Sequence, residues 1–167
     1  MLKMIGYWKA SCEDNYPNPK DFISIQYWED VSKMIFWRFF REFAEKVFND
    51  EMTGEEFRTE IERWTNTTIE HVAVYLDEHK PCNKYFGFSG CRICGQGLGS
   101  FERTDGTYIW PEKLSHYIRE HKIMLPSEFI IHTFKGLESL DYQTDFWIHS
   151  MNKITLQKDL TYPNLGV

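Results

Sequence analysis

A short segment, residues 91–121, constrains this chain more than any other, because it brings four metal-binding side chains close together in sequence. Cys91 and Cys94 are separated by two residues, and His116 and His121 are separated by four. Thiolate sulfur and imidazole nitrogen are the donors that hold Zn²⁺ in structural sites. The spacing therefore predicts one zinc ion bound by these two cysteines and two histidines.

The residues between the two pairs predict how such a site would be built. Gly95 follows the second cysteine and can adopt the positive φ of a tight turn, as in a zinc knuckle. Residues 99–110 have the pattern of a hairpin around Asp105 and Gly106, because Asp-Gly is a strong two-residue turn signal. Pro111 favours the first turn of a helix that carries both histidines. The order of knuckle, hairpin and helix is typical of a ββα or treble-clef-like module.

The histidine spacing places a condition on that helix. On an ideal helix, His116 and His121 would point in directions about 140° apart. They reach one ion only if the helix tightens or ends near His121, and Pro126 soon afterwards favours an ending. His132 is a reserve ligand, although we interpret it as a hydrogen-bonded residue on a short helix. Whether His132 or Asp105 contributes to the metal site stays open.

Other interpretations of the cysteine pair carry less support. The simplest is a reduced thiol pair with two surface histidines nearby. A thioredoxin-like redox role is disfavoured, because the pair does not lie between a strand and the start of a helix. In a reducing compartment Cys12 and Cys82 are expected to be ordinary thiols.

Composition limits the cellular compartment and the kinds of partner that we expect for this chain. The chain has 167 residues and a formal net charge of −6, which disfavours coating nucleic acid through bulk charge. The first residues lack the apolar run of a signal peptide, and no window reaches the ~18 apolar residues of a membrane span. We therefore expect a cytoplasmic protein without a membrane segment.

Hydrophobic periodicity predicts an α+β protein with a helical amino-terminal part. Apolar residues recur at three- and four-residue spacing over residues 29–49, which indicates an amphipathic helix and the main core helix. Thr53 and Glu56 form a capping-box pattern that starts a helix over residues 54–64. Asn66 is expected to cap a third helix, which Pro81 stops.

These elements predict one domain over residues 1–136. It would comprise the helical part, residues 1–85, and the zinc module, residues 86–136. Residues 137–167 are expected to form a carboxy-terminal extension packed on that domain, with a short helix around 142–150 and a strand around 153–157.

A longer pattern surrounds the cysteine and histidine pairs. The run CRICGxxxGSxxxTDGxYxWPxxLxHYxxxH is followed by LPxEF and preceded by GYW, YPNP and VAVYL. This pattern resembles a family of small uncharacterised, mostly bacterial proteins. The resemblance supports the metal site and the interpretation that about the first 130 residues form one unit, but it implies no activity. The matching pieces are residues 6–8, 16–22, 72–76, 91–95, 104–111, 114–117 and 125–129.

Three classes of function follow from a zinc module in an acidic chain. The first is a non-catalytic protein-binding or regulatory module, adaptor-like or immunity-like, since a filled Cys2His2 sphere leaves no position for water. The second is a zinc-dependent hydrolase, whose general base would be Asp105, Glu112, Glu120 or Glu128. The third is a zinc-finger-like nucleic-acid-binding protein, which would use Arg92, Arg103, Lys113, Arg119, Lys122, Tyr108 and Trp110.

The first class is favoured. Nucleic-acid binding is disfavoured, because basic and acidic residues alternate in the zinc module and do not form a positive stripe. An acidic amino-terminal part with many aromatic residues suits a protein interface and a basic partner. The candidate contact residues, which could equally be buried in the core, are Tyr7, Trp8, Tyr16, Tyr27 and Trp28.

Overall fold

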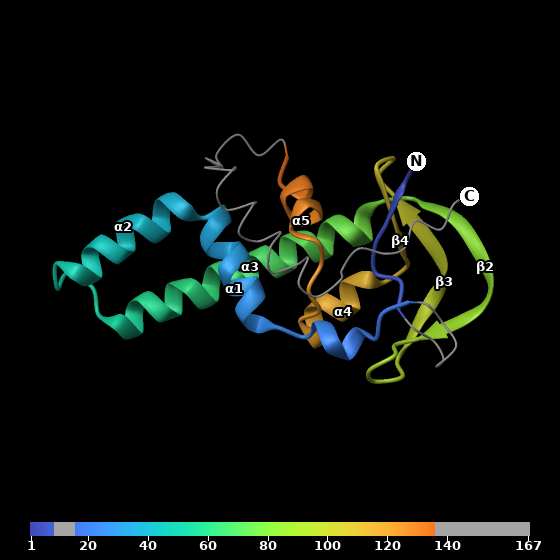
Figure 1. The fold of residues 1–167 in the computed structure, drawn as a ribbon, viewed down its shortest axis with the longest axis horizontal. Helices are drawn as coiled ribbons and strands as arrows, with labels where there is room; N and C mark the ends of the chain where they lie inside the picture. The colour runs from blue at the N-terminus through green and yellow to red at the C-terminus, as the bar shows by residue number, and fades with distance from the viewer. Residues whose placement is uncertain (9–15, 136–167) are drawn as a thin grey trace.

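The computed structural model describes residues 1–8 and 16–135, without the side chains of residues 85, 86 and 98. The described chain forms five α-helices, one short 3-10 helix at Pro19–Phe22 and one four-stranded mixed sheet, so the predicted α+β class is confirmed. The sheet lies at one end of the molecule and a pair of helices extends from the other (Figure 1). The expected extension, residues 137–167, lies outside the described residues, as does Cys12.

The sheet has the order β1-β4-β3-β2, in which β1 is parallel to β4 and the other pairs are antiparallel. The predicted hairpin is confirmed: Gly106 has a φ of +88°, and the Asp105 carboxylate accepts the backbone N–H groups of Thr107 and Tyr108. Pro111 ends β4, so its predicted place in a helix is wrong. The strands are β1 (Lys3–Met4), β2 (Pro81–Gly90), β3 (Gly97–Thr104) and β4 (Tyr108–Pro111).

The longest helix, α3 (Gly54–Glu78), runs through the whole molecule (Figure 1). The predicted capping box is present: the Thr53 hydroxyl accepts the Glu56 N–H, and the Glu56 carboxylate accepts the Thr53 N–H. The predicted break at Asn66 is wrong. The hydroxyls of Thr65, Thr67 and Thr68 each donate to the carbonyl four residues earlier, so the threonines remain compatible with one continuous helix.

The predicted single helix over residues 29–49 is also wrong. The chain forms α1 (Ile25–Ile35) and α2 (Trp37–Phe48), and they meet at Phe36, whose φ of −98° and ψ of 29° leave the helical region. The Phe36 ring stacks on the Trp64 ring of α3, with the ring centroids 6.0 Å apart. The apolar periodicity continues across Phe36, so the sequence pattern gives no signal for the bend.

Of these two helices, only α1 belongs to the core. Six of its residues are buried, whereas none of the twelve residues of α2 is buried. Figure 1 shows α2 lying beside the first half of α3 as a two-helix arm, away from the sheet. The prediction that residues 29–49 form the main core helix therefore holds for α1 and is wrong for α2.

The core lies between α1, α3, the sheet and two short helices. These are α4 (Leu114–His121) and α5 (Ser127–Thr133). Trp28, Val72, Trp110, Ile118 and Phe129 are fully buried in one cluster. Because α4 packs against α3, the two histidines of α4 are held in position by the core. None of the described helices has both the length and the apolar character that crossing a bilayer requires.

Candidate metal centre

The structure brings together all four residues that the sequence predicts as ligands. One ligand atom from each of Cys91, Cys94, His116 and His121 lies within 4.8 Å of the others, so the group could hold a metal ion. The cysteines lie in the turn between β2 and β3, and the histidines lie on α4. We call these four residues the Cys2His2 group.

The cysteine turn is held by backbone hydrogen bonds. The Gly95 N–H donates to the Cys91 carbonyl at 2.9 Å, and the Cys91 N–H donates to the Gln96 carbonyl at 2.7 Å. Gly95 has a φ of +78°, which a residue with a Cβ rarely adopts, so glycine suits this position. The Ile93 N–H points at the Cys91 sulfur, 3.4 Å away. Both sulfurs are thereby placed on the side of the turn that meets α4.

The second half of the group depends on where α4 ends. The last residue of α4 is His121, and Lys122 adopts a left-handed conformation with a φ of 53°. The expected helix ending near His121 is therefore confirmed. The imidazole centroids of His116 and His121 lie 5.1 Å apart, and the Nε2 atom of each ring lies within reach of a cysteine sulfur, so both rings face the cysteine turn.

The distances within the group fit four donors around one ion. Cys91 Sγ lies 3.4 Å from His121 Nε2, and Cys94 Sγ lies 3.4 Å from His116 Nε2. In a tetrahedral site with usual Zn–S and Zn–N bond lengths, a sulfur and a nitrogen ligand are about 3.6 Å apart. Cys91 is buried, Cys94 is exposed and both histidines are half-buried, so the group lies at the protein surface.

Electrostatics favour the metal-binding form of His116. Burial lowers the pKa of His116, and the neighbouring His121 lowers it further. A histidine ring must be neutral to donate a lone pair to a metal ion. This environment therefore favours the protonation state that ligation needs.

Tyr117 supports the Cys2His2 group from α4. Its hydroxyl accepts the Arg92 N–H at 2.8 Å, which ties α4 to the cysteine turn. Burial raises the pKa of Tyr117 to about 12, so the phenol remains protonated. Its position beside His116 in a helix that carries two candidate ligands is the only sequence signal for this role.

Asp105 and His132, the other open ligand candidates, bind each other. His132 Nε2 lies 2.9 Å from Asp105 Oδ2, and the Tyr75 hydroxyl donates to the same oxygen at 2.7 Å. Although burial raises the pKa of Asp105, hydrogen bonds from Tyr108, Tyr75, Thr107 and His132 outweigh it and lower the pKa. This network ties the hairpin turn to α3 and α5, which agrees with the interpretation of His132 as a hydrogen-bonded residue.

The acidic residues expected of a hydrolase are mostly engaged elsewhere. Glu112 accepts the Ser100 N–H and lies 3.7 Å from the Arg103 guanidinium. Glu128 pairs with Lys3 at 3.4 Å. Glu120 is exposed on α4. Apart from Glu120, each candidate base has a structural partner that explains its presence.

Three of the basic and aromatic residues expected to bind nucleic acid are also engaged or buried. Arg119 pairs with Glu70 and Asp77 of α3 at 2.7 and 2.8 Å. Tyr108 and Trp110 are buried, which removes them as stacking platforms. Of the aromatic residues expected to contact a protein partner, Trp8, Tyr27 and Trp28 are buried and only Tyr7 and Tyr16 are partly exposed.

Comparison with protein-family models, with curated proteins and with solved structures finds no match to this chain. The family resemblance based on the sequence pattern therefore stays a prediction. The case for any function depends on the geometry of the described residues.

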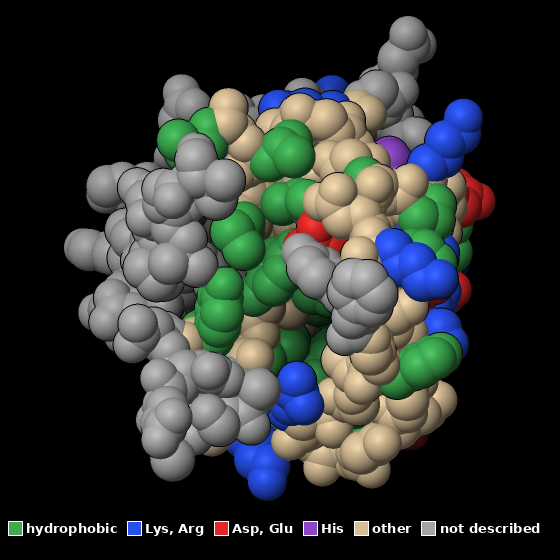
Figure 2. Space-filling model, turned by 90° about the vertical axis from the view of Figure 1, so that its right-hand side faces the viewer, with side chains coloured by type: hydrophobic (Ala, Val, Ile, Leu, Met, Phe, Trp, Pro, Cys, Tyr) green, Lys and Arg blue, Asp and Glu red, His purple; other side chains and the backbone are tan. Residues whose placement is uncertain are grey.

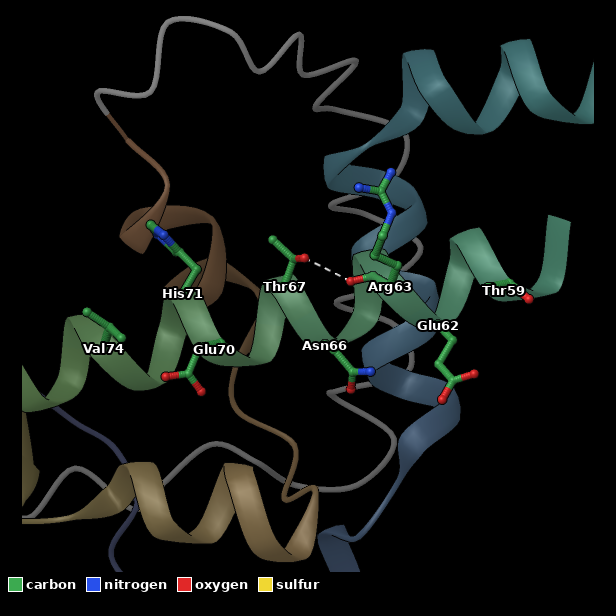
Figure 3. Close-up of a pocket in the computed structure, with 8 residues that line it drawn as sticks. All are labelled: Thr59, Glu62, Arg63, Asn66, Thr67, Glu70, His71 and Val74. Atoms are coloured by element: carbon green, nitrogen blue, oxygen red, sulfur yellow. Dashed lines mark hydrogen bonds between the residues drawn. The ribbon is translucent and has the colours of Figure 1, made fainter. Parts of the chain in front are cut away.

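A surface hollow with a volume of about 910 Å³ lies along α3 (Figure 3). Every residue that lines it belongs to α3, so among the described residues it has a single wall. Figure 3 shows Glu62 and Asn66 turned away from Arg63, and the Thr67 hydroxyl donates to the Arg63 carbonyl. These polar groups do not converge on one point, so we do not treat this hollow as a site.

Proposed function

We propose that this protein is a zinc-stabilised, non-catalytic module that binds another protein. The observation that carries the proposal is the Cys2His2 group, whose donors come from a hydrogen-bonded turn and from a helix held by the core. Two thiolates and two imidazoles match the donor set of structural zinc sites. The metal would join the turn after β2 to α4, which backbone hydrogen bonding alone does not do.

The donor count favours a structural role for the metal. Catalytic zinc sites have three protein ligands and keep one position for water, whereas structural sites are filled by four. The Cys2His2 group supplies four donors. The runner-up is a zinc-dependent hydrolase, for which Glu120 is the remaining candidate base.

X-ray absorption at the zinc edge tests the closed site. For protein purified without chelators or added metal, we expect one zinc per chain with two sulfur and two nitrogen neighbours. Elemental analysis of the same sample gives the stoichiometry. A shell of three protein ligands and one oxygen would move the function to a hydrolase, and a zinc content well below one would remove the proposal altogether.

The protein-binding part of the proposal depends on the two-helix arm, residues 37–63. Phe39 is 52% exposed and Phe48 is 89% exposed, and both lie on α2. The arm carries eight acidic and five basic side chains, a net charge of −3. Exposed aromatic side chains supply contact area at interfaces, while an acidic surround favours a basic partner and repels phosphate.

Capture from native cells tests the arm with a matched variant. We expect the wild-type protein to recover a specific basic protein, with recovery that falls as salt rises. A Phe39→Glu/Phe48→Glu variant should lose that protein, whereas Phe88→Glu, an equally exposed aromatic position on β2, should retain it. Recovery of nucleic acid by the wild type would overturn the proposal, as would recovery of the same protein by both variants.

A further inference from the structure

A small cavity lies on the face of the sheet that points away from α3. Arg103 and Trp110 point toward α3, because they donate to the carbonyls of His79 and Leu76. Side chains alternate between the two faces of a strand, so Glu102 points to the opposite face. Beside it lies a cavity of about 350 Å³, which is in the range of small-molecule sites. Figure 2 shows this side, where acidic atoms lie in a hollow bordered by hydrophobic side chains.

Four aromatic residues line the cavity. Tyr7 and Tyr16 stack with their ring centroids 6.1 Å apart, and Trp8 packs against Tyr117 with a separation of 5.9 Å. The face of an aromatic ring carries partial negative charge and attracts cations. Several rings around one cavity are the usual means by which proteins bind alkylated ammonium groups.

Two carboxylates lie at this place, and only one of them has no cationic partner. Glu112 lines the cavity but pairs with Arg103 at 3.7 Å, whereas Glu102 lies behind Tyr7 with only 3% of its surface exposed. Glu102 accepts hydrogen bonds from the Tyr7 hydroxyl and from Asn83 Nδ2, and it forms no ion pair with any residue that the structure describes. Neutral donors hold its orientation but leave the negative charge uncompensated. Buried carboxylates are usually paired with a cation, so this arrangement favours a positively charged ligand.

We propose that this cavity binds a small alkylated ammonium ion. The rings of Tyr7, Trp8, Tyr16 and Tyr117 would surround the cationic head, and the Glu102 carboxylate behind Tyr7 would supply the opposite charge. A free anion is disfavoured as the main ligand, since it would approach the Glu102 carboxylate. The cavity adjoins the Cys2His2 group through Arg92 and Tyr117 but uses none of its four candidate ligands, and the proposal does not depend on the protein-binding role of the arm.

Arg92 defines what the rest of the ligand could be. It lines the cavity with an exposed side chain, and its backbone N–H is fixed by Tyr117. A guanidinium at this position would bind a carboxylate carried on the same ligand. Free quaternary amines and betaine-like compounds share the ammonium group. Only the betaine-like compounds also carry a carboxylate that Arg92 could bind.

Isothermal titration of the full-length, metal-loaded protein tests the site with matched probes. We expect choline to bind at least about tenfold more tightly than 3,3-dimethylbutanol, its neutral isostere, because only the cation gains from the rings and the Glu102 carboxylate. Glycine betaine distinguishes the two ligand kinds: an affinity above that of choline, lost in Arg92→Gln, would assign a betaine-like ligand. Equal affinity for choline and its isostere, or no binding of either choline or glycine betaine, would overturn the proposal.

Two cavity variants and one control variant test whether choline binds in the cavity. Tyr16→Ala and Glu102→Gln should each weaken choline binding at least about fivefold, because each removes part of the attraction to the cation. Phe48→Ala changes an exposed aromatic at the far end of the molecule and should leave the affinity unchanged. Thermal melting of each variant confirms folding before titration. If folded Tyr16→Ala and Glu102→Gln both bind choline as the wild type does, the cavity is not the site.

Discussion

Replacement of Cys94 by alanine is expected to release the metal and to destabilise the protein by several kcal/mol, as loss of a structural zinc does. The side chain of Cys94 is exposed, so its removal leaves no buried cavity. Surface substitutions away from special features usually change stability by no more than about 0.5 kcal/mol. A large loss at this position would therefore have to come from the metal.

Denaturant unfolding and zinc content, measured on the same samples, check this expectation. Cys82→Ala is the matched control, because Cys82 is an exposed thiol on β2 outside the Cys2His2 group. It should retain one zinc per chain and wild-type stability. If Cys94→Ala also retains the metal, or loses it at no cost in stability, the structural role of zinc is wrong.

The candidate metal residues could be predicted from sequence because the information is local. Cys91 and Cys94 share one turn, so their spacing alone brings two sulfurs together. His116 and His121 required one further condition, the end of the helix, and the nearby proline indicated it. The distance between the two pairs depends on the packing of α4 against α3, which no spacing rule supplies.

The cavity beside Glu102 could not be predicted, because its parts come from distant segments. Tyr7 and Glu102 are 95 residues apart in the chain and meet only when β1 adds to the sheet beside β4. In sequence, Glu102 is an ordinary charged residue within the β3 pattern. Its burial depends on Tyr7 and Asn83, so only the assembled sheet shows that a carboxylate lies beneath aromatic rings.

The helix predictions were correct where local contacts determine the helix boundary and wrong where tertiary packing determines it. The capping box at Thr53 satisfies the first backbone N–H groups of α3 by local contacts, and its sequence signature was sufficient. The division of α1 from α2 follows the position of Phe36 against Trp64, a contact across 28 residues. Periodicity reports which face of a helix is apolar, and it does not report whether anything covers that face.

Replacement of Trp28 by alanine is expected to lower the free energy of unfolding by about 3–5 kcal/mol, the usual cost of deleting a large buried aromatic side chain. Trp28 lies on α1 with 0% of its surface exposed, and its Nε1 donates to the Ile123 carbonyl at 3.2 Å. The alanine variant would create a cavity and also leave a buried carbonyl without its donor. Chemical denaturation measures this loss. The slope of the unfolding free energy against denaturant concentration should remain unchanged.

Phe39→Ala on α2 is the matched control for Trp28→Ala. The sequence pattern places Phe39 in the same apolar face as the α1 core residues, but the structure exposes 52% of it. We expect a change of no more than about 0.5 kcal/mol for the isolated chain, because little apolar surface is lost from the interior. A loss as large as that of Trp28→Ala would mean that α2 is covered in solution. The arm would then be part of the core and would no longer be available as the surface proposed for a basic partner.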